Sequence, residues 1–340
     1  MLTSCGLNES VGRNLHHFTK GAYEIVLNTA FPLEQADVEN IAGYLTQNYK
    51  GEFFLSETRS ALIPCRTETT YDGIKIKGAG FEGGPVRFGT LHKYDYSVPY
   101  YDYEGNYSPD VAKDFHRAYA GGMTYQQTLQ EFQVSSYLVA QNFETYPPLG
   151  YGLIKYNGLC SWFCLLNAPF RAPVDGDRLY DTEENIKTTT TFLAKSQKEL
   201  YRLGVNLVLS GITAIDGKLI RKDFHTSVIA SPNDSFMTRL CYFLFDVNFV
   251  LYLYVDPHRP VRNHPKTPKG CNLARIEYVR GLTDMDSSIT EVDEFKKLLV
   301  VLKENHSLNV YERVEFLKRN SLTKKMLMQF MSEDEKAQFL

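Results

Sequence analysis

A short run of lysines and glycines has the residue types that phosphate binding requires. Lys77 ends the alternating run Ile-Lys-Ile-Lys at residues 74–77, and glycines follow at positions 78, 80, 83 and 84. A lysine ammonium neutralises phosphate charge, and bare glycine backbone can approach phosphate oxygens closely. On a regular strand Lys75 shares the face of Lys77. The run therefore predicts a phosphate site at Lys77, Gly78 and Gly80, with Lys75 nearer its rim.

Two aspartates in the second half of the chain could supply the remaining groups of a nucleotide site. Asp223 lies between two apolar stretches at residues 219–231, a layout typical of a kinase catalytic loop. Asp246 follows the apolar run 240–245, where a buried acid needs a partner such as a metal ion. We therefore expect Asp223 to assist the nucleophile and Asp246 to bind Mg²⁺.

The residues around these acids depart from the usual kinase motifs. Ile-Arg-Lys-Asp replaces His-Arg-Asp, and Val228 occupies the position of the expected asparagine. The Asp-Phe-Gly position reads Asp246-Val247-Asn248. One metal ligand is therefore missing, and Asn248, Ser227 or His225 could replace it, since the spacing does not choose among them.

A second acid competes with Asp223 for the loop position. It belongs to Asn233-Asp234, which stands closer in sequence to Asp246. Asp223 is preferred because Ser-Pro-Asn-Asp, at 231–234, is typical of a turn between strands.

Residues 71–154 resemble selenoprotein O and its relatives, which are kinase-fold proteins. In that family a Lys-Gly-Ala-Gly strand end precedes a helix with a glutamate before phenylalanine, matched here by IKIKGAG and by Glu131-Phe132. The resemblance implies that Glu131 pairs with Lys77, that Arg87 reaches a phosphate, and that ATP and Mg²⁺ are the cofactors. It also implies nucleotidyl transfer to a protein hydroxyl, whereas the loop of Asp223 indicates phosphoryl transfer.

Periodic patterns predict the elements that would position these residues. Strands are expected within 51–80 and as a pair that ends near Asn167, and residues 125–140 have helical spacing. Further helices are expected at 33–49 and 188–203, and a capping box of Ser288 and Glu291 predicts a helix near the C-terminus. Two regions, 219–231 and 240–255, are interpreted as strands or strand-loop pieces.

This order of elements predicts an α+β, bilobal, protein-kinase-like fold. Residues 1–50 are expected to form an N-terminal extension, and 51–168 an N-lobe with a tyrosine-rich insertion at 81–120. Residues 169–340 are expected to form a helical C-lobe with extra C-terminal helices. No internal repeat is visible.

Composition excludes several other classes of protein. The 340 residues are 43% hydrophobic, with 37 basic against 40 acidic side chains and a net charge of −3. Such a chain can bury a large core and has no excess charge to bind nucleic acid. The six cysteines include no CxxC pair, which indicates reduced thiols in a cytoplasmic protein. We expect no secretory signal and no membrane span.

The sequence leads to two alternative functions. The first is an ATP-dependent transferase that acts on a protein substrate. The second is a pseudokinase scaffold, favoured by the altered motifs, whose insertion 81–120 would bind a partner. Divergent kinases of this kind also occur among bacterial effectors delivered into host cells, where a host protein would be the partner.

Overall fold

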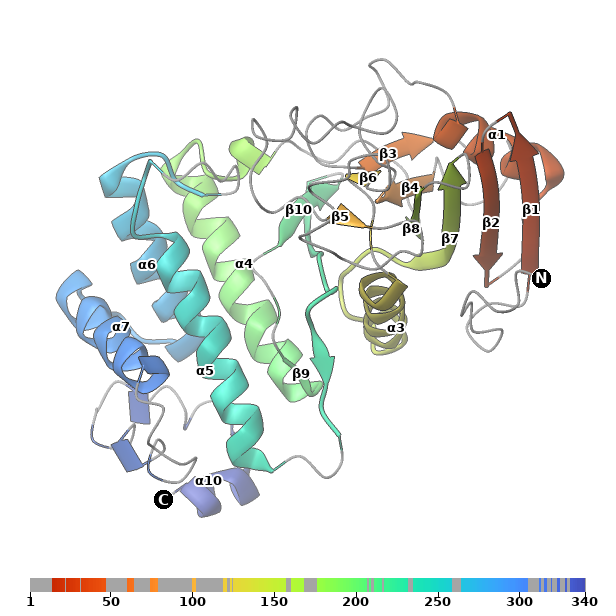
Figure 1. The fold of residues 1–340 in the computed structure, drawn as a ribbon. Helices are drawn as coiled ribbons and strands as arrows, with labels where there is room; N and C mark the ends of the chain where they lie inside the picture. Colours follow the sequence, from red (N-terminus) through yellow and green to blue (C-terminus); the bar gives the residue numbers. More distant parts are fainter. Residues whose placement is uncertain are drawn as a thin grey trace. The chain divides into compact units, whose positions relative to one another are not determined.

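The structure is a computed structural model of the chain. It describes residues 14–21, 23–30, 32–46, 60–63, 74–78, 100–101, 119–120, 123, 125–156, 160–167, 176–206, 208, 211–215, 217–231, 235–258, 264–304, 312, 315–316, 319, 323–324, 328 and 331–339. The contacts divide the chain into two compact units, Met1–Ala172 and Pro173–Leu340. Each unit is described by itself (Figure 1).

The first unit is built on a six-stranded antiparallel sheet. Its strand order is β1-β2-β7-β8-β4-β3. The strands are β1 (Asn14–Lys20), β2 (Tyr23–Thr29), β3 (Ser60–Ile63), β4 (Ile74–Lys77), β7 (Pro148–Tyr156) and β8 (Cys160–Asn167). The expected pair β7 and β8 and the expected strand β4 are present. Residues 14–29, expected in an extension, instead form two strands of this sheet.

Two helices of the first unit contact the sheet. Helix α1 (Gln35–Thr46) contacts β1 and β3, and α3 (Tyr125–Ala140) contacts β7 and β8. Helix α3 ends where Asn142 adopts a left-handed conformation, with φ 59°, which is a common way for a helix to stop. A short pair of strands, β5 (Tyr100–Tyr101) and β6 (Tyr119–Ala120), comes from the tyrosine-rich region. The rest of 81–120 lies outside the described residues.

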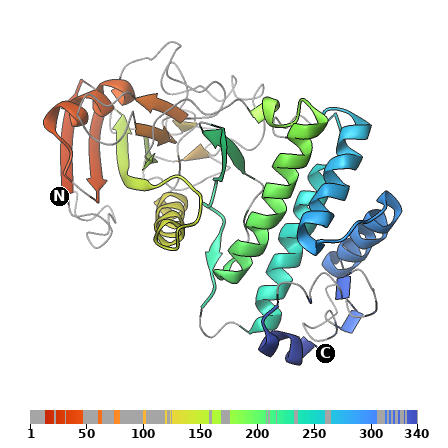
Figure 2. The ribbon, with the colours of Figure 1, turned by 180° about the vertical axis from the view of Figure 1, so that it is seen from behind.

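The second unit is mainly helical. The helices that the structure describes over their full length are η3 (Gly176–Leu179), α4 (Glu183–Arg202), α5 (Phe236–Leu253), α6 (Pro268–Thr283), α7 (Ile289–Glu304) and α10 (Glu333–Phe339). Figure 2 shows α4, α5, α6 and α7 packed together. Between α4 and α5 lie two small antiparallel pairs, β10 (Ile212–Ile215) with β11 (Lys218–Arg221), and β9 (Val205–Asn206) with β12 (Val228–Ile229).

Two predicted helix ends in this unit are confirmed. Helix α4 ends as expected before Gly204, whose φ is 73°. At the start of α7, the Ser288 N–H donates to the Glu291 carboxylate and the Glu291 N–H donates to Ser288 Oγ. These two bonds are the reciprocal pair of a capping box.

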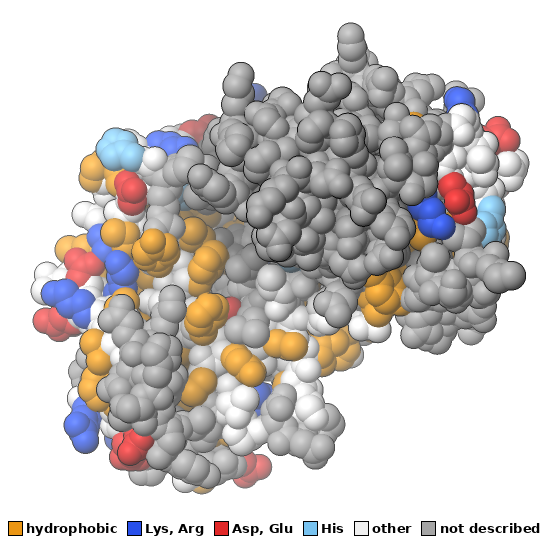
Figure 3. Space-filling view, viewed as in Figure 1, with side chains coloured by type: hydrophobic (Ala, Val, Ile, Leu, Met, Phe, Trp, Pro, Cys, Tyr) orange, Lys and Arg blue, Asp and Glu red, His pale blue; other side chains and the backbone are white. Residues whose placement is uncertain are grey.

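Helix α5 corrects the strand interpretation of residues 240–255. Ser235 Oγ accepts from the Thr238 N–H and caps the helix. The buried residues recur at three or four positions, as helical packing requires: Phe236, Leu240, Phe243, Leu244, Val247, Val250, Leu251 and Tyr254. The opposite face holds the exposed Tyr242, Phe245 and Tyr252. Figure 3 shows hydrophobic side chains, in orange, on the surface of the molecule. Because both faces are apolar, the helical period is hard to detect in the sequence.

None of the helices in the described ranges has both the length and the apolar content needed to cross a bilayer.

Candidate functional site

An ion pair joins the sheet of the first unit to helix α3. Lys77, the last residue of β4, places its Nζ 2.9 Å from Glu131 Oε1 and 2.7 Å from Oε2. The Lys77 side chain is 15% exposed and that of Glu131 only 5%. The pair expected from the sequence is therefore present, and it is largely removed from water. In such surroundings an ion pair is screened less than one at the surface.

Aromatic packing fixes the helix that carries Glu131. The ring of the next residue, Phe132, meets Tyr151 of β7 edge to face, with 5.8 Å between centroids. Both rings belong to a buried cluster with Leu165 of β8, which is the strand partner of Lys77. The same contacts that seat α3 on the sheet thus bring the Glu131 carboxylate to the lysine.

The second lysine of β4 is not at a rim. Lys75 is 8% exposed, and its Nζ lies 4.1 Å from the ring centroid of Tyr146. A cation over an aromatic face is stabilised by the ring quadrupole. Lys75 is therefore a buried cation on the face of the sheet that carries Lys77.

The glycines expected beside the phosphates are described only in part. Gly78 follows Lys77 directly and has φ 81°, a conformation that other residues rarely adopt. The chain thus turns sharply where β4 ends. Gly80 and Arg87 lie outside the described residues.

In the second unit, Asp223 occupies the connection between β11 and β12. This is the expected layout of a strand, an acid and a second strand. Asp223 has φ 68°, which is uncommon for a residue other than glycine. Its side chain is 29% exposed, and its Oδ2 lies 3.8 Å from Lys222 Nζ. The neighbouring Phe224 is fully buried and anchors the connection.

Gly211 makes room for the Asp223 carboxylate. A Cβ at position 211 would lie 2.7 Å from Asp223 Oδ2 and 2.6 Å from the carbonyl oxygen of Lys222. Contacts this short are not tolerated, so a side chain here would displace the acid. The Lys222 N–H also donates to the Gly211 carbonyl oxygen, at 3.0 Å. Asp223 is therefore held against the backbone that precedes β10.

Asp246 does not lie at the end of a strand. It lies within α5, is 2% exposed, and its Oδ2 accepts from Gln197 Nε2 and from the Val208 N–H, both at 3.1 Å. The burial cost that suggested a metal ion is thus offset by protein donors. Through Val208 the carboxylate holds the segment between β9 and β10.

Gln197 links Asp246 to a buried arginine. Arg221, at the end of β11, is 0% exposed; it donates to Gln197 Oε1 at 3.3 Å and to Ser196 Oγ at 3.2 Å. Burial lowers the pKa of Arg221 to about 10, while Tyr278 and Asp246 act in the opposite direction. Arg221 therefore keeps its charge at neutral pH, two residues before Asp223.

Asn248, expected as a second metal ligand, does not lie beside Asp246. Asn248 is two residues further along α5, and side chains two apart on a helix do not face each other. Within the part of the chain that the structure describes, no group of three or more His, Cys, Asp or Glu side chains could hold a metal ion. Ser227 and His225 lie in the connection between β11 and β12, and Asn233-Asp234 lies outside the described residues.

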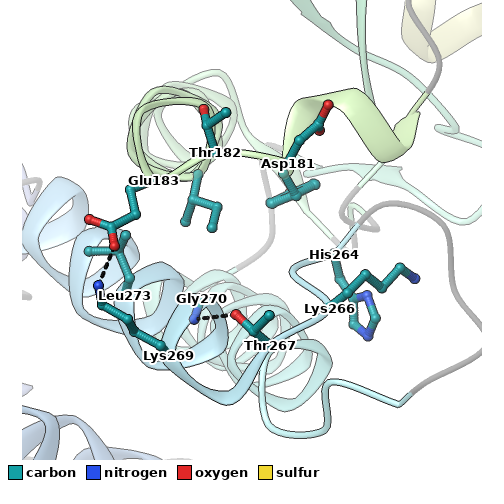
Figure 4. A pocket seen from close by; sticks show the side chains of 11 residues that line it. Asp181, Thr182, Glu183, His264, Lys266, Thr267, Lys269, Gly270 and Leu273 are labelled. Carbon is teal, nitrogen blue, oxygen red and sulfur yellow. Dashed lines mark hydrogen bonds and ion pairs between the residues drawn. The ribbon is translucent and has the colours of Figure 1, made fainter.

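A cavity of about 420 Å³ lies at another place in the second unit, between the first turns of α4 and α6 (Figure 4). Glu183 and Lys269 form an ion pair at its edge, and Thr267 Oγ1 accepts from the Gly270 N–H. The other charged residues of its lining, Asp181 and Lys266, also have opposite signs. The lining therefore has no net charge to attract a phosphate.

Several residues of these sites carry no motif that would identify them in the sequence. Gln197 and Arg221 are ordinary members of a helix and a strand, and their pairing depends on how the two pack. Gly211 could be recognised only as a glycine before an apolar run. The burial of Lys75 follows from Tyr146, which is 71 residues away in sequence.

Comparisons with known proteins give distant structural likenesses, of which one is described here. No protein-family model matches the sequence, and no curated protein matches it. Among solved structures, the chain is similar to that of WaaP in complex with acyl carrier protein, with a TM-score of 0.32 and 11% sequence identity. The alignment covers 79% of this chain and 88% of that chain. No family is therefore assigned to the chain.

Proposed function

We propose that this protein is an ATP-dependent transferase that moves a phosphoryl or an adenylyl group from ATP to a protein hydroxyl. The observation that carries the proposal is the buried ion pair of Lys77 and Glu131. A strand lysine fixed by a helix glutamate is one of the parts that protein kinases require for phosphoryl transfer. Two other features of the first unit support it, namely the sharp turn at Gly78 and the rigid seating of α3.

Each residue has a defined task in this proposal. The Lys77 ammonium neutralises phosphate charge, and Glu131 keeps it in place. Asp223 replaces Asp246 as the proposed Mg²⁺ ligand, because its carboxylate is partly exposed whereas that of Asp246 is buried and accepts two hydrogen bonds. One carboxylate can be enough, since Mg²⁺ usually takes its other ligands from phosphates and water. When bound, the ion would neutralise charge on the transferring group.

The two reactions differ in which phosphorus atom the substrate hydroxyl attacks. In phosphoryl transfer the hydroxyl oxygen bonds to the γ-phosphorus, the bond to the β,γ-bridging oxygen breaks, and ADP leaves. In adenylyl transfer the oxygen bonds to the α-phosphorus, and pyrophosphate leaves. The hydroxyl proton passes to solvent or to a base in either case.

One observation favours a second candidate, a protein that binds nucleotide without transferring a group. In protein kinases an acid in the catalytic loop precedes the metal-binding acid along the chain. Here the segment between β9 and β10 reads Leu-Val-Leu-Ser-Gly and contains no acid. If Asp223 binds the metal, no catalytic base is supplied from that segment. A pseudokinase would retain Lys77, Glu131 and Asp223 for binding alone.

Labelled ATP distinguishes these possibilities. The protein is incubated with MgCl₂, a mixed protein substrate and ATP labelled at the γ- or the α-phosphorus. Label from the γ-position on protein indicates phosphoryl transfer, and label from the α-position indicates adenylyl transfer. Nucleotide binding without either label supports the second candidate. Absence of both binding and transfer overturns the proposal.

Variants of the ion pair provide the control for folding. Lys77→Met alone leaves Glu131 buried without its cation, which we expect to destabilise the protein by about 3 kcal/mol. The double variant Lys77→Met with Glu131→Gln removes both charges, so it should be more stable than Lys77→Met while remaining inactive. Lys155→Met is the matched control, because Lys155 forms a more exposed ion pair with Glu24 in the same sheet. It should retain full activity.

A further inference from the structure

One face of helix α5 carries a row of aromatic side chains. Its members are Tyr242, Phe245, Phe249 and Tyr252. Phe249 is partly buried, and the other three residues are 38%, 44% and 53% exposed in chain order. With 3.6 residues in each turn, the four positions lie within an arc of about 80° and extend about 15 Å along the helix. We call this set the aromatic row.

The aromatic row is not the face that packs in the core of the second unit. The buried residues of α5, such as Leu240, Val247 and Val250, lie on the other side of the helix. The exposed face of such a helix usually carries charged side chains. The two charged residues of α5 are Arg239 and Asp246, and neither belongs to the row. Core packing therefore does not account for the apolar character of this exposed face.

The order of its residues makes the aromatic row self-complementary. The spacings are three, four and three positions, and the types are Tyr, Phe, Phe and Tyr, so the row is the same in both directions. When two copies of α5 pack antiparallel across a two-fold axis, Tyr242 faces Tyr252 of the other copy, and Phe245 faces Phe249. A two-fold interface uses the same patch on both subunits, and alternating spacings of three and four are typical of a seam between helices. The row thus has the pattern of a seam between two identical helices.

The charges of α5 favour a protein partner over other kinds of partner. Arg239 Nη2 lies 2.6 Å from Glu335 Oε1, and Asp246 is buried and accepts two hydrogen bonds. A surface that binds nucleic acid or anionic lipid requires basic residues, and the row has none. Tyrosine and phenylalanine are enriched where proteins contact each other. The row therefore fits a surface that is itself aromatic and uncharged.

We propose that the aromatic row of α5 binds the same row of a second copy of this chain, with the two helices antiparallel. The inference is independent of the proposed function. An aromatic side chain has about 200 Å² of surface, so the three exposed members present about 300 Å² in each copy. The dimer would bury about 600 Å² from these residues, which is less than stable complexes bury. We therefore expect a weak dimer with a Kd of about 10–100 μM.

Sedimentation equilibrium of the full chain from about 1 to 300 μM tests the inference. We expect the average mass of the wild-type protein to rise from that of a monomer towards that of a dimer. Phe245→Glu places a carboxylate in the seam, where it would lose water without gaining a partner, so it should weaken the association by about tenfold or more. At low concentration its unfolding midpoint should match that of the wild type, because Phe245 is exposed in the single copy.

Val301→Glu is the matched control. Val301 lies on α7 of the same unit and is 45% exposed, close to the 44% of Phe245. The variant adds the same charge outside the aromatic row. It should associate as the wild type does.

A mixture of two variants tests the antiparallel arrangement. Phe245→Glu and Phe249→Lys should each associate more weakly than the wild type. When the two are mixed, the antiparallel arrangement places the new carboxylate of one copy opposite the new ammonium of the other, so mixed dimers should form more readily than either variant dimerises alone. In a parallel arrangement each new charge would face a phenylalanine, and mixing would have no effect.

Three outcomes would contradict the inference. A wild-type chain that stays monomeric up to about 300 μM overturns it. A dimer that Phe245→Glu leaves intact also overturns it, because its interface must then lie elsewhere. A mixture that associates no better than either variant alone overturns the antiparallel arrangement.

Discussion

The neighbours of each acid decide what that acid can do. Glu131 accepts from a lysine, and Asp246 accepts from an amide and a backbone N–H. Both carboxylates are buried. Asp223 is more exposed and lies in a sharply turned connection. The first two are therefore suited to holding other groups in position, and Asp223 is suited to contact with a ligand.

The positioning task of Asp246 predicts a loss of stability when it is replaced. Asp246→Leu removes the acceptor of two buried donors and the negative charge nearest the Arg221 network, so it should lower the free energy of unfolding by about 3 kcal/mol. Asp246→Asn keeps an oxygen that can accept from the Val208 N–H, and it should cost less. Urea unfolding measures both. If Asp246 were a Mg²⁺ ligand instead, its replacement would leave the free energy of unfolding unchanged and alter the Mg²⁺ dependence of activity.

The elements were predictable where one period dominated the sequence. Short, glycine-bounded stretches rich in strand-favouring residues predicted the β7 and β8 pair, and Ser288 with Glu291 predicted the start of α7. Helix α3 was predicted correctly, but its spacing did not identify the polar residues that it buries. Thr128 and Glu131 are buried, whereas Val139 is 37% exposed. Glu131 can be buried because Lys77 of the sheet pairs with it. Such a partner is distant in sequence, so the local residue pattern does not predict this burial.

The helical period of α5 is not visible in the sequence, because both faces of the helix are apolar. The 18 residues of α5 are more than a strand normally contains, so the length of the apolar run distinguished helix from strand better than its hydrophobicity did. Helix α6 was not anticipated at all, because charged residues are dispersed along it. The sequence indicated Asp246 as a possible site residue. It did not indicate that Asp246 lies on helix α5, and this location brings its carboxylate to Gln197 and Val208.

The helical assignment of residues 240–255 can be tested with two phenylalanines. Phe243 is 1% exposed and packs on Tyr201, with 5.1 Å between ring centroids. Phe245 is 44% exposed. Phe243→Ala should lower the free energy of unfolding by about 4 kcal/mol, and Phe245→Ala by less than about 1 kcal/mol. In a strand the two side chains would share a face, so equal losses in chemical denaturation would contradict the helix.

At the scale of the molecule, four buried or largely buried tyrosines make the second unit sensitive to alkali. Burial raises the pKa of Tyr180 from 10.0 to about 12, and it also raises the pKa values of Tyr201, Tyr254 and Tyr278. Above pH 10 the unfolded chain loses these protons while the folded chain keeps them. Folding stability is therefore lost between about pH 10 and pH 12.

We expect the free energy of unfolding to fall by several kcal/mol across that range. Tyr180 alone accounts for about 3 kcal/mol. Burial lowers the pKa of Arg221 to about 10, so this residue adds stability as the pH rises through the same range. The four tyrosines together outweigh this single opposing contribution. Urea unfolding at intervals from pH 8 to pH 11.5 measures the effect, and Tyr180→Phe should make the decline shallower. A flat profile would contradict the prediction.

The backbone at Asp223 has a consequence for protein engineering. A left-handed conformation costs a residue with a Cβ on the order of 1 kcal/mol more than it costs glycine, so Asp223→Gly would relieve strain at this position. The same substitution would remove a partly exposed carboxylate for which Gly211 leaves room, so greater stability would come with the loss of that acid.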